Sequence, residues 1–238
     1  MPAGRKAAKT PANRLLSLLK HGDYQRLRPH LHRVPLACGQ SLYGARKPIE
    51  FVYFIETGVG SVMNAVATGH AIEVGTIGNE GMVGLPLVFG KTMAPTSVCI
   101  QIPGTGLRME ATQFERELAR STSMRALMLR YANASYNHVA LLNACNHFHS
   151  IQQRCARWML RTQDRMQSNE FPLAQKYLAM ILGVQRTGIS GAASSLQRAG
   201  LIRYKRGNVT ILDRSGLKRR SCDCYSASKQ TFDHLLGD

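Results

Sequence analysis

The sequence has no long hydrophobic run and few acidic residues, and each absence narrows the class of protein. No apolar stretch approaches the ~20 residues that a helix needs to span a bilayer. Only 14 Asp and Glu stand against 31 Lys and Arg, so the formal net charge is +17. Such a charge favours a polyanionic partner, because every neutralised phosphate releases condensed counterions. DNA, RNA and acidic membranes fit this charge equally well.

The six cysteines form no known metal or disulfide motif, since their spacing is irregular and no CxxC occurs. Cys145, His147 and His149 lie close in the sequence, and Cys222 and Cys224 lie near its end. Neither spacing matches a zinc or haem motif. We therefore expect mostly small buried thiols, no metal and no cofactor, and we assign no role to Cys222 and Cys224.

Two further kinds of segment are missing. There is no nucleophile–base pattern and no phosphate-binding loop, so we predict no catalytic residue and no enzyme. The basic residues 1–12 are followed by an apolar patch too short for a secretory signal. We expect these residues to form a mobile tail on a cytoplasmic protein without a membrane partner.

The segment up to about residue 111 has short apolar runs separated by glycines. A short helix is predicted for residues 13–19. The β-branched and aromatic runs at residues 51–55, 59–66 and 71–77 predict strands, with Gly58 ending the first. Short strands with a turn glycine every few residues indicate a small antiparallel roll or barrel. A sandwich is the alternative, because the local pattern is the same.

Residues 112–150 contain no Gly or Pro, which predicts one long helix. One face of this helix carries an a/d heptad stripe, the pattern of a seam between two helices. The stripe consists of Leu127, Tyr131, Ala134, His138, Leu141, Cys145 and Phe148. We predict a homodimer seam at these residues; the alternative is a helix that packs only on its own domain.

Residues 175–194, QKYLAMILGVQRTGISGAAS, predict a helix-turn-helix that follows a helix at residues 151–166 and a loop at 168–172. Ala179 stands where two helices cross closely, and Gly183 stands at a turn that favours positive φ. Ile189 would anchor the second helix on the first. Another kind of Ala-rich helical pair is the alternative.

The second helix, predicted at residues 185–199, would place its first turn in the major groove. Its candidate DNA-contacting residues are Gln185, Arg186, Thr187 and Ser190. Arg186 can donate to both acceptors of a guanine, and Gln185 suits an adenine. Thr187 and Ser190 reach either bases or phosphates.

Residues 201–212 predict a hairpin with a basic tip. Lys205 and Arg206 would contact phosphate there, which positions the protein but reads no sequence. The charge distribution agrees, because residues 149–238 hold 15 Lys and Arg against 6 Asp and Glu.

With these residues in view, the sequence resembles the Crp/Fnr family of bacterial transcription regulators. The resemblance rests on YFIETG at residues 53–58, IGNEGMVG at 77–84, LGVQRTGI at 182–189 and LQRAGLI at 196–202. It implies an α+β fold with an N-terminal antiparallel, cyclic-nucleotide-binding-like β-roll at residues 13–111. A dimerisation helix at 112–150 and a winged helix-turn-helix domain at 151–238 would follow.

The resemblance also implies partners: a second copy of the chain, double-stranded promoter DNA, RNA polymerase and an unidentified small-molecule effector. The family's recognition-helix arginine falls on Arg186. The effector pocket would include Gly78, Glu80, Gly81, Thr96 and Ser97. A cyclic-nucleotide-responsive signalling module without DNA readout is the alternative function.

The sequence also departs from the family's pattern. Cyclic-nucleotide members carry an arginine for the cyclic phosphate, but residues 94–98 read APTSV. Burying a phosphate without its cation is costly, so cyclic AMP is not expected to bind. Residues 1–37 lack the cysteines of an iron–sulfur sensor, and Thr187 replaces the acidic residue that often follows the recognition arginine. The operator, the effector and the direction of regulation do not follow from the sequence.

Overall fold

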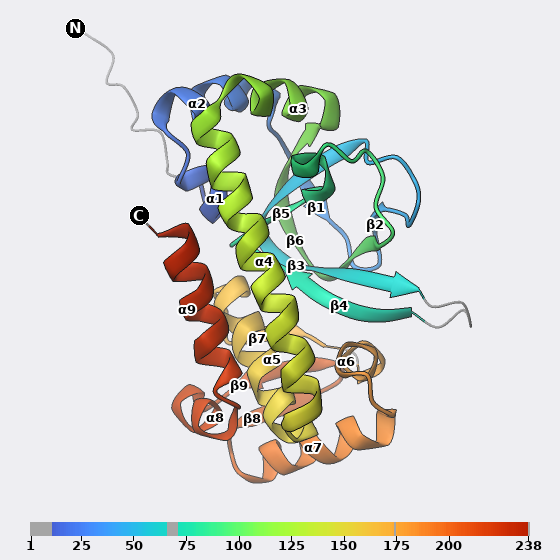
Figure 1. Ribbon diagram of the computed structural model, residues 1–238. Helices are drawn as coiled ribbons and strands as arrows, with labels where there is room; N and C mark the ends of the chain where they lie inside the picture. The colour runs from blue at the N-terminus through green and yellow to red at the C-terminus, as the bar shows by residue number, and fades with distance from the viewer. Residues whose placement is uncertain (1–10, 66–70, 174, 238) are drawn as a thin grey trace, which may run out of the picture.

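The computed structural model describes residues 11–65, 71–173 and 175–237, without the side chains of Gln175, Lys176 and Arg186. Residues 1–10 of the predicted N-terminal tail lie outside the described residues. The described chain forms a β-rich N-terminal part and a helical C-terminal part, joined by a long helix that runs along both (Figure 1). No helix among these residues has the length and apolarity to cross a membrane.

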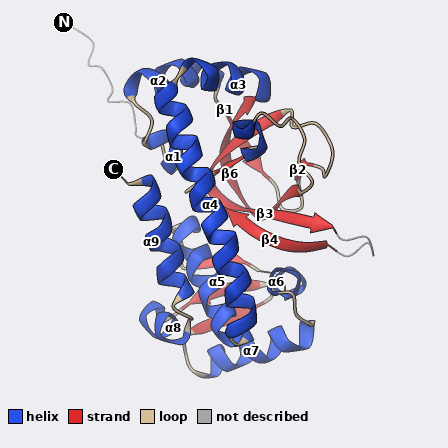
Figure 2. Ribbon diagram, in the orientation of Figure 1, coloured by secondary structure: helices blue, strands red, loops and turns tan. Residues whose placement is uncertain are grey.

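The N-terminal part is an antiparallel sheet with the order β1-β6-β3-β4, in which β2 adds to β6 and β5 to β3 (Figure 2). Its strands are β1 (His32–Leu36), β2 (Ser41–Tyr43), β3 (Phe51–Ala65), β4 (Ala71–Ile77), β5 (Met82–Val83) and β6 (Ser97–Glu110). The long strands β3 and β6 pair along most of their length and bulge at several points. The predicted antiparallel roll is confirmed.

The prediction that Gly58 ends its strand is wrong. Gly58 lies inside β3 with φ 96°, between two bulges. A Cβ at this position would stand 2.7 Å from the carbonyl oxygen of Ile102. Glycine is therefore needed for a close strand approach in a bent strand, not for a turn.

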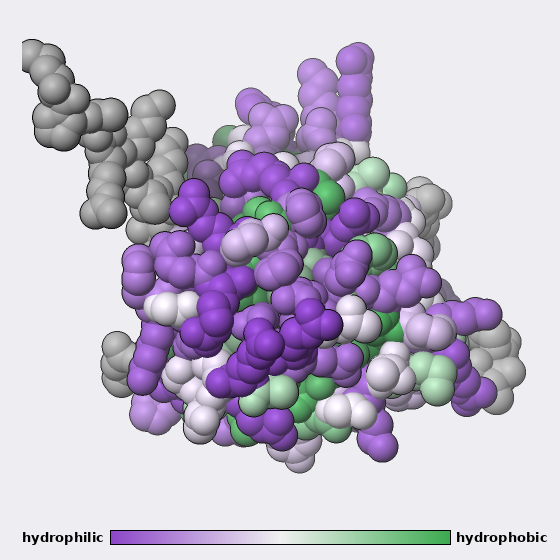
Figure 3. All heavy atoms as spheres, turned by 90° about the horizontal axis from the view of Figure 1, so that it is seen from above, coloured by the Kyte–Doolittle hydropathy of each residue, from purple (hydrophilic) through white to green (hydrophobic). Residues whose placement is uncertain are grey.

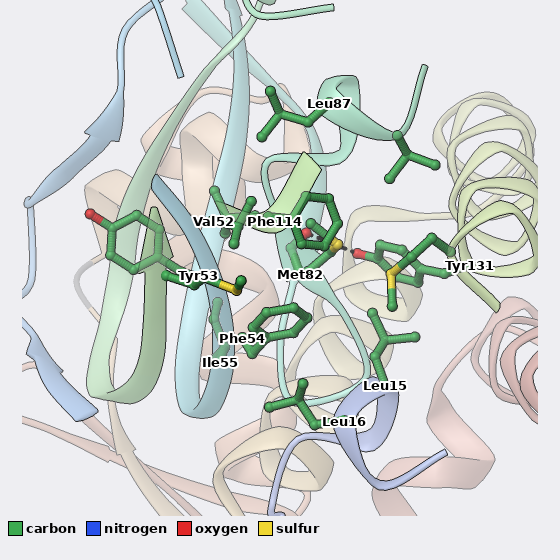
Figure 4. Packing of buried hydrophobic residues seen from close by; sticks show 14 of the residues in the cluster. Leu15, Leu16, Val52, Tyr53, Phe54, Ile55, Met82, Leu87, Phe114 and Tyr131 are labelled. Carbon is green, nitrogen blue, oxygen red and sulfur yellow. Dashed lines mark hydrogen bonds between the residues drawn. The ribbon is translucent and has the colours of Figure 1, made fainter. Parts of the chain in front are cut away.

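The core of the roll is filled by aliphatic and aromatic side chains from sheet and helices (Figure 4). Phe54 of β3 faces Phe114, with ring centroids 6.4 Å apart. Leu15 and Leu16 of α1 (Arg14–Ser17) are also fully buried. Asn13 caps α1, and its side-chain amide donates to the carbonyl oxygens of Ile55 and Gly81 at 2.8 Å each.

The predicted helix at residues 112–150 is two helices. They are α3 (Ala111–Arg120) and α4 (Thr122–Phe148). Ser121 separates them, because its hydroxyl accepts from the backbone N–H of Met124 as an N-cap. The same hydroxyl donates to Asp23 of α2 (His21–Leu27), which also accepts from Ser123. A buried carboxylate therefore fixes the break, and the local sequence pattern did not indicate it.

Short helices complete this part: η1 (Arg28–His30) and η2 (Leu85–Phe89). Seen from the end that carries α2 and α3, the surface is largely hydrophilic, with apolar side chains in small patches (Figure 3).

The C-terminal part begins with α5 (Ile151–Met166), whose bounds match the predicted helix. Then follow β7 (Glu170–Pro172), α6 (Gln175–Leu182), α7 (Arg186–Arg198), β8 (Ile202–Lys205), β9 (Asn208–Ile211), α8 (Arg214–Arg220) and α9 (Cys224–Leu236). The predicted loop at 168–172 contains β7, which joins β9 and β8 in a small antiparallel sheet. The last helix, α9, was not predicted and runs back along α4 (Figure 1).

The predicted dimer stripe of α4 lies mostly inside the protomer, so the seam prediction is corrected. Five of its seven members, Leu127, Tyr131, Ala134, His138 and Cys145, are buried by the chain's own elements; Leu141 is half-buried and Phe148 is exposed. The stripe is a real helix–helix seam, but its partner is α9 of the same chain.

Three contacts define this intrachain seam. The ring of Tyr131 packs against Phe232 of α9, with centroids 6.5 Å apart, while its hydroxyl donates to the carbonyl oxygen of Met82 in β5, 3.3 Å away (Figure 4). The His138 imidazole and the hydroxyl of Ser228 in α9 are 2.9 Å apart, and its ring packs against Phe232. Burial and three nearby arginines hold the pKa of His138 well below its usual value, so it is neutral at pH 7.

Candidate DNA-binding site and sensor cavity

Helices α6 and α7 form a helix-turn-helix whose turn is built by Gly183. This residue has φ 61°, which glycine adopts without strain. The N–H of Val184 donates to the carbonyl oxygen of Ala179 at 3.1 Å, which closes the end of α6. Ala179 and Ile189 are buried between the helices. The three positions behave as the sequence predicted, so the helix-turn-helix is confirmed.

The N-terminal part of α7 and its N-cap carry four of the six predicted DNA-contacting residues. Gln185 is the N-cap residue and is exposed, Thr187 is exposed and Ser190 is half-buried. Arg186 is the first residue of α7; its side chain lies outside the described part of the structure. Helix α7 is held on α5, where the Gln152 amide donates to Ser195 at 3.1 Å. The predicted DNA-contacting residues of α7 therefore lie together at its N-terminus, on a helix that is held in place by α5.

The hairpin of β8 and β9 forms the predicted wing beside α7. Arg206 and Gly207 at its tip both have positive φ, 51° and 79°, as a two-residue turn of this kind requires. The side chains of Lys205 and Arg206 are exposed. The Tyr204 N–H donates to the side-chain carbonyl of Gln197 in α7 at 2.7 Å. The wing is thereby fixed to the recognition helix, and both present polar groups.

A cavity of about 480 Å³ lies between the roll and α4. Apolar side chains dominate its lining, with Met82, Phe89, Met93, Val139 and Phe232 among them. Of the five residues predicted for the effector pocket, all of which the structure describes, only Thr96 lines this cavity. Its polar groups include Tyr43, Lys91 and His138. The cavity suits a mainly apolar molecule.

The other predicted pocket residues lie outside this cavity, which corrects their assignment. Glu80 pairs with Arg165 of α5, whose Nε lies 3.1 and 3.2 Å from the two carboxylate oxygens, and with Arg161 at 3.4 Å. Burial would raise the pKa of Glu80, but Arg165 and Arg161 lower it to about 2. The segment therefore joins the roll to the C-terminal domain through an ion pair.

The glycines beside Glu80 allow the same packing. A Cβ on Gly78 would overlap the side chain of Arg165, and one on Gly81 would overlap the Tyr131 hydroxyl. Thr76 accepts from Arg165 through its hydroxyl at 2.7 Å and its carbonyl at 3.1 Å. Ser97 starts β6 and is half-buried. Sequence reasoning missed Arg165, because nothing local relates it to Glu80, which lies 85 positions earlier.

The structure also contains a cluster of cysteine and histidine side chains that the spacing in the sequence did not reveal. Cys145, His149, Cys222 and Cys224 come together where α4 ends and α9 begins. The i, i+4 spacing of Cys145 and His149, which puts both on one helix face, was the available signal. The second pair is supplied by a distant chain segment, since Cys222 follows Cys145 by 77 positions, and sequence spacing cannot reveal such a contact.

The structure combines a β-roll, a long helix and a winged helix-turn-helix, which is the fold class of the Crp/Fnr-type transcription regulators. Residues 153–220 match the family model of the Crp-like helix-turn-helix domain. No curated protein sequence matches the chain.

Solved structures share the whole architecture. FixK2 from Bradyrhizobium japonicum superposes with a TM-score of 0.69 at 14% identity, over 81% of this chain and 98% of that one. A CRP-family transcriptional regulator from Thermus thermophilus gives 0.58 at 19%, over 79% and 96%. CLP of Xanthomonas campestris, a c-di-GMP responsive global regulator, gives 0.56 at 16%, over 81% and 99%. The family model thus identifies a Crp-like helix-turn-helix domain at residues 153–220, and the solved structures show that the chain has the fold of the Crp/Fnr regulators.

Proposed function

We propose that this protein is a homodimeric regulator that reads promoter DNA in the cytoplasm with the first turn of α7. The observation that carries the proposal is the exposed N-terminus of α7 beside a basic wing. Gln185 and Thr187 are exposed there, and Lys205 and Arg206 extend from the neighbouring hairpin. A helix end of this kind fits the major groove, while a basic hairpin fits the phosphate backbone.

The charge of the C-terminal part supports DNA as the ligand. Lys218, Arg219 and Arg220 at the end of α8 are exposed in addition to the wing residues. Binding that neutralises several phosphates weakens steeply with salt. A membrane or RNA would also attract these charges, but neither needs a helix-turn-helix with an exposed recognition turn.

The exposed face of α4 is the proposed dimer surface, in place of the buried stripe. Leu129, Tyr136 and Val139 are exposed there, with Tyr136 at 73%. Together with Ala132 they follow the 3-4-3 spacing of a second a/d stripe. A second copy of the chain, packed helix against helix, would cover these side chains and place two α7 helices for two half-sites.

The cavity is the proposed effector site, and it is continuous with the dimer surface. Tyr136 and Val139 belong to both, so a molecule bound in the cavity would touch the residues that meet the partner. The effector would be mainly apolar. Cyclic AMP would not bind with useful affinity, because no arginine is among the described residues that line the cavity. Lys91 lines it, but the arginine that pairs with the cyclic phosphate in cyclic-nucleotide members is missing. Micromolar binding in calorimetry would contradict this.

Selection of bound duplexes from a random DNA pool tests the proposed function. We expect enrichment of an inverted repeat whose two half-sites lie about one helical turn apart, roughly 10–10.5 base pairs between centres or a multiple of it. The affinity for the selected site should fall steeply with salt. Failure to enrich any sequence, or a nearly flat salt dependence, would favour the signalling module without DNA readout. RNA polymerase would be tested as a partner on the selected site.

A further inference from the structure

Four side chains that could bind a metal lie together and belong neither to the first turn of α7 and the wing nor to the lining of the cavity. Cys145 and His149 come from the last turn of α4 and its C-cap. Cys222 lies in the turn between α8 and α9, and Cys224 is the first residue of α9. Their four ligand atoms all lie within 4.8 Å of one another. The three cysteines are buried and His149 is half-buried. All six cysteines of the chain are free thiols.

The distances within this cluster are those of a tetrahedral site. The sulfurs of Cys145 and Cys222 are 3.5 Å apart, and the sulfur of Cys224 is 3.6 Å from Nδ1 of His149. A tetrahedral zinc ion with ordinary bond lengths separates two sulfurs by about 3.8 Å and a sulfur and a nitrogen by about 3.5 Å. The side chains therefore need only small shifts to bind one ion.

The surroundings supply what such a site needs beyond its ligands. The Nε2 of His149 lies 3.4 Å from the carboxylate of Asp223, so this carboxylate can orient the ring while Nδ1 faces the sulfurs. Arg154 and Arg157 are buried, and the Nε of each has no hydrogen-bond partner in the described structure. Both interact electrostatically with Cys145. A site of three thiolates, one imidazole and a divalent ion carries one negative charge, which balances buried guanidinium charge.

We propose that Cys145, His149, Cys222 and Cys224 bind a single zinc ion. Three sulfurs and one nitrogen in a closed tetrahedron suit zinc, which needs no open position in a structural site. An iron–sulfur cluster is not favoured, because its ligands bind different irons and stand further apart than these four atoms. The proposal does not depend on the DNA-binding function.

The ion would add a link between two parts of the chain that already meet through packing and the His138–Ser228 hydrogen bond. Cys145 and His149 lie at the end of α4, which leads into the C-terminal domain. Cys224 begins α9, the helix that packs along α4, and Cys222 lies just before it. Zinc would hold α9 against α4 and fix the junction between α4 and α5. We therefore expect the metal to raise the melting temperature of the protein, because it binds the folded state alone.

Metal analysis of the full-length reduced protein is the first test. We expect one equivalent of zinc after purification without chelator. Cobalt should replace it and give the intense visible absorption and sulfur-to-metal charge-transfer bands of a tetrahedral thiolate site. Removing the metal with a chelator should lower the melting temperature, and one equivalent of zinc should restore it.

Variants locate the site. Cys222→Ser and Cys224→Ser should each weaken zinc binding on the order of a hundredfold or more, because a hydroxyl replaces a thiolate ligand. His149→Ala should also weaken it, and Asp223→Asn should weaken it by about 10–100-fold by releasing the ring. His147→Ala and Cys38→Ser are matched controls, since both residues are exposed and lie outside the cluster. Both should bind like the parent protein.

Three results would overturn the proposal. The first is a reduced, folded parent protein that takes up neither zinc nor cobalt at one equivalent. The second is unchanged cobalt absorption in the Cys222→Ser, Cys224→Ser double variant, with circular dichroism confirming that it is folded. The third is a Cys145–Cys222 disulfide found in the native protein together with no metal uptake after reduction, which would assign the cluster to thiol oxidation.

Discussion

Two short glycine-containing segments resemble the same family, and the structure uses them differently. Around Gly183, the spacing in the sequence matches the local geometry of a helix-turn-helix. Around Gly81, the same kind of match suggested an effector pocket, but Glu80 pairs with Arg165 of the C-terminal domain. The cavity is lined instead by residues of β4, β5, η2 and α4, without Glu80.

The difference follows from how far each feature reaches along the chain. A helix-turn-helix is made by about 20 consecutive residues, so local spacing specifies it. A pocket is lined by side chains from distant segments, and replacing a few of them changes its chemistry while the backbone stays the same. The predictions below test this contrast, from the largest expected effect to the smallest.

Removal of Glu80 should be the most damaging change. Glu80→Ala leaves the guanidinium of Arg165 buried without its carboxylate, and loss of one partner of such a pair costs about 3–5 kcal/mol. Denaturant unfolding should therefore detect a large drop in stability. Glu50→Ala, at an exposed carboxylate, is the control and should change the free energy of unfolding by less than about 0.5 kcal/mol. Equal stability of the two variants would mean that the ion pair does not join the domains.

The same ion pair predicts a pH dependence. The pKa of Glu80 is lowered to about 2 in the folded protein, from 4.5 for an ordinary glutamate. Its contribution is therefore complete above about pH 4.5 and is lost as the pH falls towards 2. The difference in unfolding free energy between the parent protein and Glu80→Gln should shrink over this range. A constant difference from about pH 5 to about pH 2 would contradict the assignment.

A charge on the exposed face of α4 should separate the dimer. Tyr136→Asp would bury an unpaired carboxylate against the partner and should weaken association on the order of a hundredfold. Asn137→Asp places the same charge one residue along the helix, on an exposed side chain outside the proposed surface. Light scattering at several concentrations should find dimers for Asn137→Asp and monomers for Tyr136→Asp. Dimers for both would place the interface elsewhere.

The turn glycine should have a smaller effect that depends on its backbone conformation. Gly183→Ala puts a side chain at φ 61° and should destabilise the protein by about 1–2 kcal/mol. Gly191→Ala is the matched control, because this exposed glycine lies within α7 and a Cβ there meets nothing within 4 Å. It should stabilise the helix by about 0.5–1 kcal/mol. A lower melting temperature for Gly183→Ala and a higher one for Gly191→Ala would support the requirement for glycine at the turn. Changes of the same sign in both variants would argue against it.

Much of the fold could be predicted from the sequence because its signals are local. The bounds of α5, the turn at Gly183 and the hairpin tip at Arg206 and Gly207 follow from periodicity and turn chemistry. The break at Ser121 was not predictable, since it depends on Asp23, which lies 98 residues away. The α4 stripe was recognised as a helix seam, but a heptad pattern does not distinguish a second chain from the same chain's own α9.

The candidate site divides in the same way. The exposure of Gln185 and Thr187 at the start of α7 was predictable, because it follows from their place in the motif. The cavity lining and the cluster around Cys145 were not, because each combines residues from distant segments of the chain. In both cases the chemistry depends on long-range contacts that only the fold creates.

Competition binding on a randomised half-site library tests the central claim, that α7 reads the sequence and the wing positions the protein. Arg186→Ala should cost about 1–3 kcal/mol on the preferred site and relax the preference at one base pair per half-site. Lys205→Ala should weaken binding to specific and random DNA about equally and reduce the salt slope by about one unit. If Arg186→Ala keeps the parent preference while Lys205→Ala loses it, the two roles are reversed and the account is contradicted.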